Sequence, residues 1–268
     1  MQKKIGFIGG GNMGGAIIAG IRKANLVDGN ALMVSDKNKE ALKRLEENYE
    51  VLTTFDNKEV ASFADILFLA VKPNLFSEVI AEIKDIVKKD VLIVSIAAGK
   101  TIKEIETTFG KNIKLVRTMP NTPAMVGEGM SALCPNEFVS EEEVIFVKEI
   151  FSSFGTAEVI KESLIDAVIG ISGSSPAYVY MFIEAMADAA VMGGMPRKQA
   201  YTFAAQAVLG SAKMVLETGI HPGELKDMVC SPGGTTIEAV VELEKQGMRS
   251  AVMEAVKVCM DKSKAMSK

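Results

Sequence analysis

The sequence predicts an α/β fold in which a doubly wound, mostly parallel sheet comes first and an all-helical part follows. Short apolar runs alternate with helical patterns up to about residue 160, as expected when each strand is followed by a covering helix. A glycine-rich turn directly follows the first run. After about Ser163 the strand signals stop and only helical patterns remain. We therefore expect two domains, over residues 1–162 and 163–268.

The strands are predicted from apolar runs that are continuous rather than alternating, because a parallel strand covered on both faces has no polar side. The expected strands span residues 4–8, 32–35, 66–71, 91–95 and 113–117, with 131–134 and 157–160 completing the sheet. The expected helices among them span residues 12–24, 37–47, from Pro73 to about 88, and 141–154.

The helical part is predicted from its apolar patterns and from its helix boundaries. Pro196 opens a helix that Gly219 ends, which is the usual asymmetry between the two ends of a helix. Thr235 and Glu238 have the spacing of a capping box, so Thr235 is the predicted N-cap of its helix. The expected helices span residues 175–192, 196–219, a short stretch from 222, 235–246 and 248–263.

The composition excludes several functional classes. The chain has 268 residues and a formal net charge of −4, so it lacks the basic surface of a general nucleic-acid binder. His221 is the single histidine, and we expect no metal site. The three cysteines form no Cys-x-x-Cys pair, which predicts free thiols in a reducing, cytoplasmic location. The N-terminus leads straight into the first strand, and no signal peptide is expected.

The longest apolar region runs from Ala167 to Met195. Pro176 and several glycines interrupt it, and Glu184 and Asp188 lie inside it, so we expect a buried helix and no membrane span. The region contains no lysine or arginine and is too apolar for the surface of a monomer. It therefore predicts at least a homodimer with this helical region at its core.

The glycine-rich turn, residues 9–14, fits the pattern G-x-G-x-x-G. Here the pattern follows a predicted strand and opens a predicted helix, as in a Rossmann-type domain that binds a nicotinamide dinucleotide. Gly9 is expected to permit the tight turn, Gly11 to let the backbone approach the pyrophosphate, and Gly14 to allow close packing. The helix N-terminus adds free N–H groups for the phosphates. The alternative is a glycine-rich turn without a ligand.

Asp36 follows the second expected strand, about 20 residues beyond the glycines. A carboxylate there usually accepts hydrogen bonds from the ribose hydroxyls and favours NAD over NADP. Ser35, Lys37 and Asn38 surround it and could instead hold a 2′-phosphate. A third interpretation is that Asp36 is the N-cap of the next helix.

Ligands of open parallel sheets lie beyond the carboxyl ends of the strands. Three further segments that follow expected strands are therefore candidates for binding the ligand. The first holds Lys72, which could neutralise a phosphate or carboxylate or could be a solvated lysine. The second holds Ala97, Ala98 and Gly99, small residues that would let a nicotinamide approach the backbone or simply form a tight turn. The segments are 70–73, 96–99 and 118–121.

A second site is predicted at Ser231-Pro232-Gly233-Gly234-Thr235-Thr236, which precedes an expected helix. Free backbone N–H groups at such a helix start form an anion site suited to a carboxylate, and the two threonines add hydroxyls. The alternative is an ordinary capped helix start.

Together these features resemble the pyrroline-5-carboxylate reductase family over essentially the whole chain. The last motif below is highly specific for that family, whereas the first is shared by many dehydrogenases. The motifs are GFIGGGNMG at 6–14, AVKP at 70–73, RTMPNTP at 117–123, GSSPAY at 173–178 and SPGGTT at 231–236.

The resemblance implies reduction of the cyclic imine of 1-pyrroline-5-carboxylate to L-proline by NADPH or NADH. The Thr236 hydroxyl would hydrogen-bond the ring nitrogen as the catalytic group. The family usually uses NADP(H) and has a small hydroxylic residue where Asp36 stands, so NAD(H) stays open. The implied substrate-binding residues are Gly233, Gly234, Thr235 and Thr236. The expected cofactor-binding residues are Ile8, Gly9, Gly10, Gly11, Asn12, Met13, Gly14, Ser35, Asp36, Asn57, Ala70, Val71, Lys72, Pro73, Ala97, Ala98 and Ser231.

The resemblance also implies helical domains that interleave into a homodimer, and rings of such dimers. Imine reduction suits a chain with one histidine, because hydride transfer neutralises an iminium charge and needs no strong general acid. Two alternatives stay open. A β-hydroxyacid dehydrogenase would need a lysine on the first long helix, but residues 170–184 contain neither lysine nor arginine. A non-catalytic dinucleotide sensor would not need residues 231–236.

Overall fold

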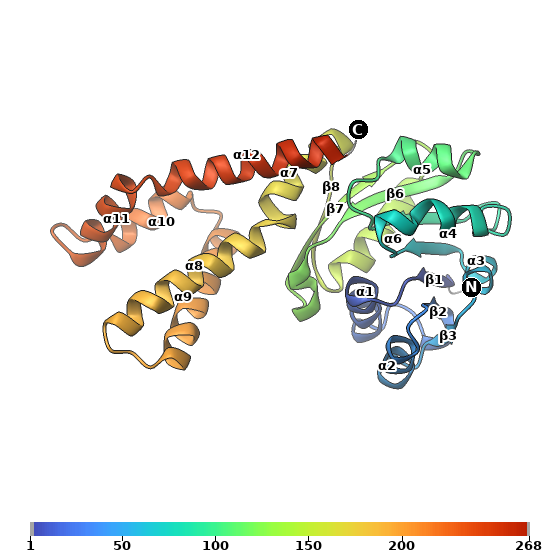
Figure 1. Ribbon diagram of the computed structural model, residues 1–268, viewed down its shortest axis with the longest axis horizontal. Coiled ribbons are helices and arrows are strands. Elements are labelled where there is room, and N and C mark those ends of the chain that lie inside the picture. The colour runs from blue at the N-terminus through green and yellow to red at the C-terminus, as the bar shows by residue number, and fades with distance from the viewer. Residues whose placement is uncertain (1–2, 267–268) are drawn as a thin grey trace. The chain divides into compact units, whose positions relative to one another are not determined.

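A computed structural model describes residues 3–266 of the chain, and it divides into two compact units. Among the described residues, one unit comprises 3–173 with 260–266, and the other comprises Ser174–Cys259. Figure 1 shows a sheet with helices in the first unit and helices alone in the second. The predicted fold class is therefore observed.

The first unit is built on one sheet of eight strands in the order β3-β2-β1-β4-β5-β6-β7-β8. All neighbouring strands are parallel except β6 and β7, which are antiparallel. Their bounds are β1 Ile5–Ile8, β2 Leu32–Ser35, β3 Leu52–Thr54, β4 Ile66–Leu69, β5 Leu92–Ser95, β6 Lys114–Met119, β7 Gly129–Pro135 and β8 Gly155–Val159.

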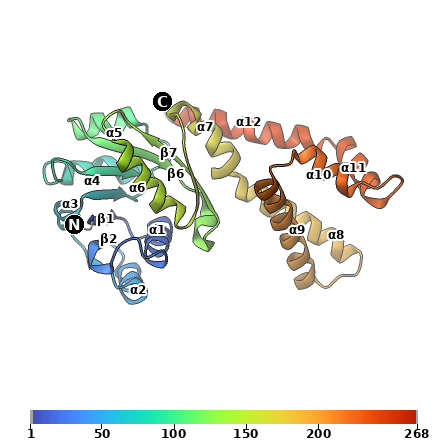
Figure 2. The same ribbon diagram turned by 180° about the vertical axis from the view of Figure 1, so that it is seen from behind.

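Helices cover both faces of this sheet, which explains why the central strands are apolar throughout. On one face Phe7 stacks on Phe68 with ring centroids 4.5 Å apart, and α1, α2 and α6 pack there. Helices α3, α4 and α5 bury their apolar residues on the other face. Figure 2 shows the sheet from behind, with α6 lying across it. The bounds are α1 Asn12–Lys23, α2 Lys39–Tyr49, α3 Asn57–Phe63, α4 Phe76–Ile83, α5 Ile102–Phe109 and α6 Glu141–Ser152.

The strand order reverses beside β1, which creates the place where a ligand can enter. β1 lies between β2 and β4, and their helices lie on opposite faces. The loops after β1 and β4 therefore diverge and leave a crevice at the carboxyl edge of the sheet.

The segment after β8 packs with the sheet unit rather than with the helices that follow. Ile165 lies in a cluster with Ala132 and Cys134 of β7. Arg117 is buried in β6 and pairs with Glu162 at 2.7 Å, and the Glu162 carboxylate also accepts the Ile102 N–H at 2.8 Å. The predicted boundary at 162/163 falls before the division seen here, because these contacts hold the connecting segment. It comprises the short helices η4 Glu162–Leu164, α7 Ile165–Val168 and η5 Ile169–Gly173.

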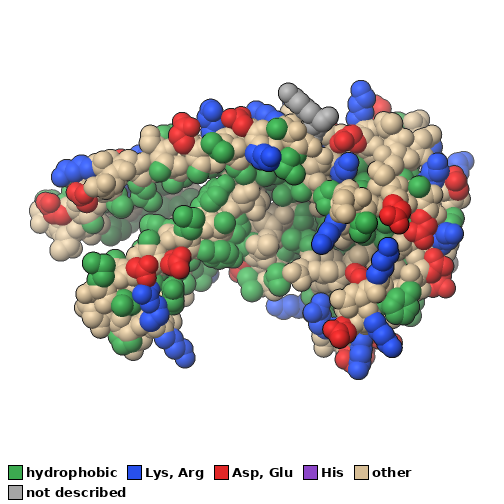
Figure 3. Space-filling model, viewed as in Figure 1, with side chains coloured by type: hydrophobic (Ala, Val, Ile, Leu, Met, Phe, Trp, Pro, Cys, Tyr) green, Lys and Arg blue, Asp and Glu red, His purple; other side chains and the backbone are tan. Residues whose placement is uncertain are grey.

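The second unit consists of helices with little core of their own. Within residues 174–259, the buried hydrophobic residues are Ala187, Ala200 and Ala204, on the packed pair α8 and α9. Many larger apolar side chains are exposed instead, among them Met192 at 90% and Leu216 at 84%. Green side chains mark these surfaces along the helices in Figure 3. The helices are α8 Ser175–Met192, α9 Arg197–Thr218, α10 Pro222–Val229, α11 Thr235–Lys245 and α12 Met248–Met266, whose last turns belong to the first unit.

Three local predictions need correction. Strand β3 and helix α3 were not predicted, because β3 has only three residues and its side chains are half-buried or exposed. Helix α2 begins at Lys39 rather than at 37, since the Asn38 side chain accepts the N–H groups of the first turn. Thr235 is not an N-cap but the first residue of α11. Within residues 3–266, no helix combines the length and apolarity that crossing a membrane requires.

Candidate functional site: a dinucleotide pocket and an open helix start

A pocket of about 350 Å³ lies at the carboxyl edge of the sheet, at the strand-order reversal. The ends of β1, β2 and β4 form one side of the pocket, and α3 and α4 contribute the other. Nine of the predicted cofactor-binding residues line it, which are Ile8, Gly9, Gly11, Ser35, Asp36, Asn57, Ala70, Val71 and Lys72. Lys37, which the sequence offered as a partner for a 2′-phosphate, also lines it. The lining residues that were not predicted are Leu75, Glu78, Val79 and Glu82.

The three glycines of the motif have different surroundings. Gly9 has φ +107°, and a Cβ there would lie 2.5 Å from the Ala70 carbonyl oxygen. A Cβ on Gly14 would lie 2.4 Å from the Gly9 carbonyl oxygen, so both positions require glycine for the fold itself. A Cβ on Gly11 would meet nothing within 4 Å. Gly11 is therefore free of any packing requirement, and its lack of a side chain matters only to what enters the pocket.

Helix α1 starts without a side-chain cap, because its N-cap is Gly11. The N–H groups of its first turn consequently have no side-chain partner and point out of the helix start. An uncapped helix start beside a glycine-rich loop can bind phosphate oxygens through these groups and through the helix dipole.

Asp36 ties the glycine-rich loop to the end of β2. Its Oδ2 accepts the Gly10 N–H at 2.7 Å and its Oδ1 accepts the Asn38 N–H at 2.8 Å. The interpretation of Asp36 as the cap of α2 is wrong, because Asn38 is that cap. Both backbone bonds hold the carboxylate at the pocket wall, where it can still accept from a ligand hydroxyl.

Asn57 links the end of β2 to helix α4. Ser35 is fully buried, and its hydroxyl donates to Asn57 Oδ1 at 2.8 Å. Asn57 Nδ2 donates to Glu82 Oε2 at 2.8 Å. These three side chains come from three different elements, and all of them line the pocket.

Charges of both signs surround the pocket. Asp36, Glu78 and Glu82 provide carboxylates, whereas Lys37 and Lys72 provide ammonium groups. Within residues 3–266, neither lysine side chain is engaged in a hydrogen bond or an ion pair, so both ammonium groups are available to an anionic ligand. Such a ring of mixed charge suits a ligand that carries both phosphates and hydroxyls.

The remaining predicted cofactor residues of this unit lie beside the pocket rather than in its wall. Gly10 bonds to Asp36, Met13 packs against the core, and Pro73 starts a short helical turn after β4. Asn12 lines a neighbouring hollow of about 190 Å³ together with residues of α2. Ala97 is buried with the core behind β5, whereas the next residue, Ala98, is exposed.

The second predicted site is the start of α11 in the helical unit. Gly233 has φ +67°, a turn closes through Gly234 N–H to the Ser231 carbonyl at 3.0 Å, and Gly234 is the N-cap. No side chain caps this helix either, so Thr235, Thr236 and the residue after them present unbonded N–H groups. The Thr236 side chain is half-buried at this start. The predicted substrate residues Gly233, Gly234, Thr235 and Thr236 thus lie in one continuous turn at an uncapped helix start.

Another side-chain cluster of the helical unit joins the start of α8 to α12. Cys259 Sγ lies 3.2 Å from Ser174 Oγ and donates to it. Burial raises the pKa of the Tyr178 hydroxyl, and its hydrogen bond with Cys259 raises it further. Tyr178 therefore stays protonated at neutral pH.

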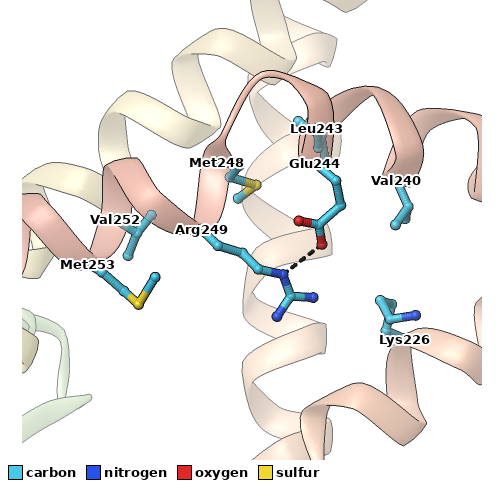
Figure 4. Close-up of a pocket in the computed structure, with 8 residues that line it drawn as sticks. All are labelled: Lys226, Val240, Leu243, Glu244, Met248, Arg249, Val252 and Met253. Carbon is cyan, nitrogen blue, oxygen red and sulfur yellow. Dashed lines mark hydrogen bonds and ion pairs between the residues drawn. The ribbon is translucent and has the colours of Figure 1, made fainter.

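A large apolar hollow of about 580 Å³ opens on α11 and α12 (Figure 4). Arg249 Nε donates to Glu244 Oε1 at 2.6 Å, and both line the hollow together with Met248, Val252 and Met253. Exposed methionine and valine side chains of this kind mark a surface that another protein covers. Within residues 3–266, no group of three His, Cys, Asp or Glu side chains is arranged to hold a metal ion.

Both parts of the chain match families of known proteins. Residues 162–266 match the family of pyrroline-5-carboxylate reductase dimerisation domains, and residues 4–99 match the family described as NADP oxidoreductase coenzyme F420-dependent. The pyrroline-5-carboxylate reductase of Escherichia coli is 55% identical over 268 residues, which is 100% of both chains. That of Methanosarcina acetivorans is 46% identical, over 100% of this chain and 99% of the other.

Solved structures of the same kind superpose along the full length. A pyrroline-5-carboxylate reductase from Coxiella burnetii has a TM-score of 0.95 at 36% identity, with 100% of both chains covered. A pyrroline carboxylate reductase from Plasmodium falciparum, solved with NADP bound, has a TM-score of 0.89 at 37% identity, again with 100% of both chains covered. The pocket at the carboxyl edge of the sheet and the uncapped turn at residues 231–236 are consistent with these matches. The 55% identity over the full length shows that the chain belongs to the pyrroline-5-carboxylate reductase family.

Proposed function

We propose that this protein reduces 1-pyrroline-5-carboxylate to L-proline with a reduced nicotinamide dinucleotide. The observation that carries the proposal is the presence, in one chain, of a dinucleotide pocket and of an uncapped helix start in the family's SPGGTT motif. The pocket accounts for a hydride donor, and the helix start accounts for a small carboxylate.

The pocket residues fit a dinucleotide on geometry. Gly11 leaves open space where the pyrophosphate would approach the backbone, and the first turn of α1 offers its N–H groups. Lys72 would balance phosphate charge, and the Asp36 carboxylate would accept from a ribose hydroxyl. When bound, the dinucleotide supplies the hydride, so the protein itself needs to bind and orient rather than to donate electrons.

The substrate side of the proposal rests on the α11 start. Its N–H groups would hold the substrate carboxylate, and the Thr236 hydroxyl would hydrogen-bond the ring nitrogen. A neutral hydroxyl can pair with an iminium that donates and with an amine that accepts, so it serves substrate and product equally. Catalysis would then come mainly from orientation of the ring, as the family's chemistry requires no strong acid.

The cofactor is proposed to be NADP(H), with NAD(H) as the alternative. The relative from Plasmodium falciparum that was solved with NADP bound supports the first. The fixed Asp36 carboxylate favours the second, because a carboxylate repels a 2′-phosphate. Lys37 stands beside it as a counter-charge.

The assembly is proposed to be a homodimer formed by the helical unit, with rings of dimers as a further expectation. The match of residues 162–266 to a dimerisation family and the exposed apolar side chains of α8, α9 and α12 support the dimer. The expected location is the cytoplasm, in keeping with three cysteines that form no disulfide among themselves.

A spectrophotometric assay tests the activity. Loss of absorbance of NADPH or NADH should depend on added pyrroline-5-carboxylate, and L-proline should accumulate in equal amount. The alternative β-hydroxyacid dehydrogenase would instead reduce cofactor with a hydroxy acid. A sensor without turnover would bind the cofactor but give no proline.

A further inference from the structure

The loop between β5 and α5, residues 96–101, lies at the carboxyl edge of the sheet beside the dinucleotide pocket. The Ile96 N–H donates to the Leu69 carbonyl at the end of β4 at 3.3 Å. The two residues that follow Leu69, Ala70 and Val71, line the pocket. A dinucleotide crosses the strand-order reversal with its adenosine half toward β2. Its other half therefore extends past β4 toward β5, which makes this loop the place for the nicotinamide end.

Two buried hydroxyl groups fix the end of the loop that leaves β5. Ser95 is fully buried, and its hydroxyl accepts the Ala97 N–H at 3.3 Å. The Thr118 hydroxyl of β6 donates to the Ser95 carbonyl at 3.0 Å. Ala97 is thereby held in the core, while the next residue, Ala98, is exposed.

The other end of the loop, the start of α5, differs from the uncapped starts of α1 and α11. Thr101 and Glu104 form a capping box that occupies the N–H groups of both residues. The Ile102 N–H lies between them and donates to Glu162 Oε1 at 2.8 Å. Three N–H groups of this helix start thus bond within the protein, and the start is an anchor for the loop.

Arg117 determines where the Glu162 carboxylate lies. Its side chain on β6 is only 4% exposed, and its Nη1 donates to the same Glu162 Oε1 at 2.7 Å. A buried guanidinium without a counter-charge is costly, so Arg117 holds the carboxylate firmly. Glu162 lies 60 positions from Ile102 in the chain. One carboxylate oxygen therefore joins the core of the sheet to the start of α5.

We propose that Glu162 is a positioning residue for the nicotinamide end of the cofactor. By accepting the Ile102 N–H from a place fixed by Arg117, it sets the start of α5 and with it the course of residues 96–101. The inference rests on the proposed function. It gives Arg117, the first residue of the RTMPNTP motif, a part in the site although its side chain is buried.

The opposite end of β6 supplies a matched control. Lys114 begins that strand and pairs with Glu143, also at 2.7 Å. Glu143 likewise accepts a backbone N–H at a helix start, that of Ser140 at 2.9 Å. Glu143→Ala therefore breaks an ion pair and a helix-start bond of the same kind, but at the amino edge of the sheet, without touching residues 96–101.

The experiment measures by calorimetry the affinity of the full-length protein for NADPH and for 2′-phospho-ADP-ribose, which lacks the nicotinamide ring. NADH and ADP-ribose replace this pair if the protein prefers them. The ratio of the two dissociation constants isolates the nicotinamide end, and the fluorescence of the bound reduced cofactor reports the surroundings of its ring.

We expect Glu162→Ala to lower the preference for the complete dinucleotide by about fivefold or more, the scale of one hydrogen bond, and to reduce the fluorescence change on binding. Glu143→Ala should alter this preference by about twofold or less, because it loses stability but not the loop. Glu162→Gln should also stay within about twofold of wild type, because its amide oxygen can still accept from Ile102.

A second variant covers the case in which Glu162→Ala does not fold because Arg117 is left without a counter-charge. Arg117→Met combined with Glu162→Ala removes both charges and keeps an apolar side chain of similar length in the core. This double variant also lacks the bond to Ile102, so the same fall in preference is expected.

A fall in Glu162→Ala or in the double variant that is absent from Glu143→Ala and Glu162→Gln supports the inference. An unchanged preference, or an equal fall in either control, overturns it. If the wild-type protein binds neither NADPH nor NADH, the proposed function fails together with this inference. That result differs from a wild type that binds the cofactor and variants that keep its preference, which would overturn the role of Glu162 alone.

Discussion

The two units of this chain bury their apolar side chains to different extents. In the sheet unit, aromatic and branched side chains such as Phe7, Phe68 and Ile17 are completely buried between sheet and helices. In the helical unit, the buried residues are three alanines, and side chains as large as Phe203 and Leu216 remain exposed. Exposure of so much apolar surface is costly in water.

The sheet unit therefore buries its apolar core within one chain, whereas the helical unit does not. The latter needs a partner surface, and the family match of residues 162–266 makes a second copy of the chain the natural partner. Ligand binding by the sheet unit and assembly by the helical unit should therefore respond to different substitutions.

The largest expected effect is on assembly. Phe203 is 67% exposed in one chain and Phe55 in the sheet unit is 64% exposed, so the two are matched in type and accessibility. Phe203→Asp should convert the oligomer to monomer, since burial of a carboxylate in place of a phenyl ring costs about 3 kcal/mol or more per copy. Phe55→Asp should leave the assembly intact. Light scattering at working concentration measures both, and a wild-type monomer would refute the comparison outright.

The next effect lies in the ligand edge of the sheet unit. Gly11→Val meets no atom in the fold but fills the pocket, so the cofactor Kd should rise by about tenfold or more with little change in Tm. Gly9→Ala should do the reverse and lower Tm, because its Cβ would lie 2.5 Å from the Ala70 carbonyl oxygen. Fluorescence titration with NADPH and thermal melts separate the two. An unchanged Kd in Gly11→Val would remove Gly11 from the site.

A smaller effect tests whether the helical unit contributes chemistry as well as assembly. Thr236→Ala should lower kcat by about tenfold, the scale of one hydrogen bond that positions the ring. Thr235→Ala should change the free energy of unfolding by less than about 0.5 kcal/mol, because Thr235 is not a cap. Steady-state kinetics of both variants test the kcat prediction, and urea unfolding of Thr235→Ala tests the stability prediction. Wild-type kcat in Thr236→Ala would leave its hydroxyl as an ordinary helix-start group.

Sequence patterns predicted the parts of the fold that depend on local order. The central strands and helix α8 are where apolar runs and helix signals placed them, and the family prediction is confirmed by 55% identity over the full chain. The motif of Gly9, Gly11 and Gly14 was informative because its context, between strand and helix, is local as well.

What sequence could not predict depends on torsion angles and on contacts between distant residues. Thr235 has the spacing of a cap, but Gly234 adopts the extended backbone of the N-cap and shifts the helix start by one residue. The Asp36 bond to Gly10 joins residues 26 positions apart. Glu82 looked like any exposed helix charge, and only its spacing of four from Glu78, on a helix leaving the ligand edge, hinted that it faces the pocket.

The smallest expected effect compares one ion pair from each unit. Glu143 in the sheet unit bonds Lys114 at 2.7 Å and accepts the Ser140 N–H at 2.9 Å, and its side chain is only 14% exposed. Glu217 in the helical unit lies 3.3 Å from Lys213 with both side chains about two-thirds exposed. Burial raises the pKa of Glu143, but the hydrogen bonds with Lys114 and Ser140 and the positive charge of Lys114 together outweigh it and lower the pKa overall.

A lowered pKa in the folded state means that the carboxylate stabilises the fold above its unfolded pKa, about 4.3, and that this stabilisation is lost as the pH falls below it. Gln at position 143 can still accept the Ser140 N–H, so Glu143→Gln isolates the charge. We expect this variant to lower the free energy of unfolding by about 1 kcal/mol at pH 7 and to match wild type near pH 3, whereas Glu217→Gln should change it by about 0.3 kcal/mol or less at either pH. Urea unfolding at the two pH values measures both differences. A pH-independent loss in Glu143→Gln would show that packing, not the ion pair, holds α6 to the sheet, and the two units would then not differ in this respect.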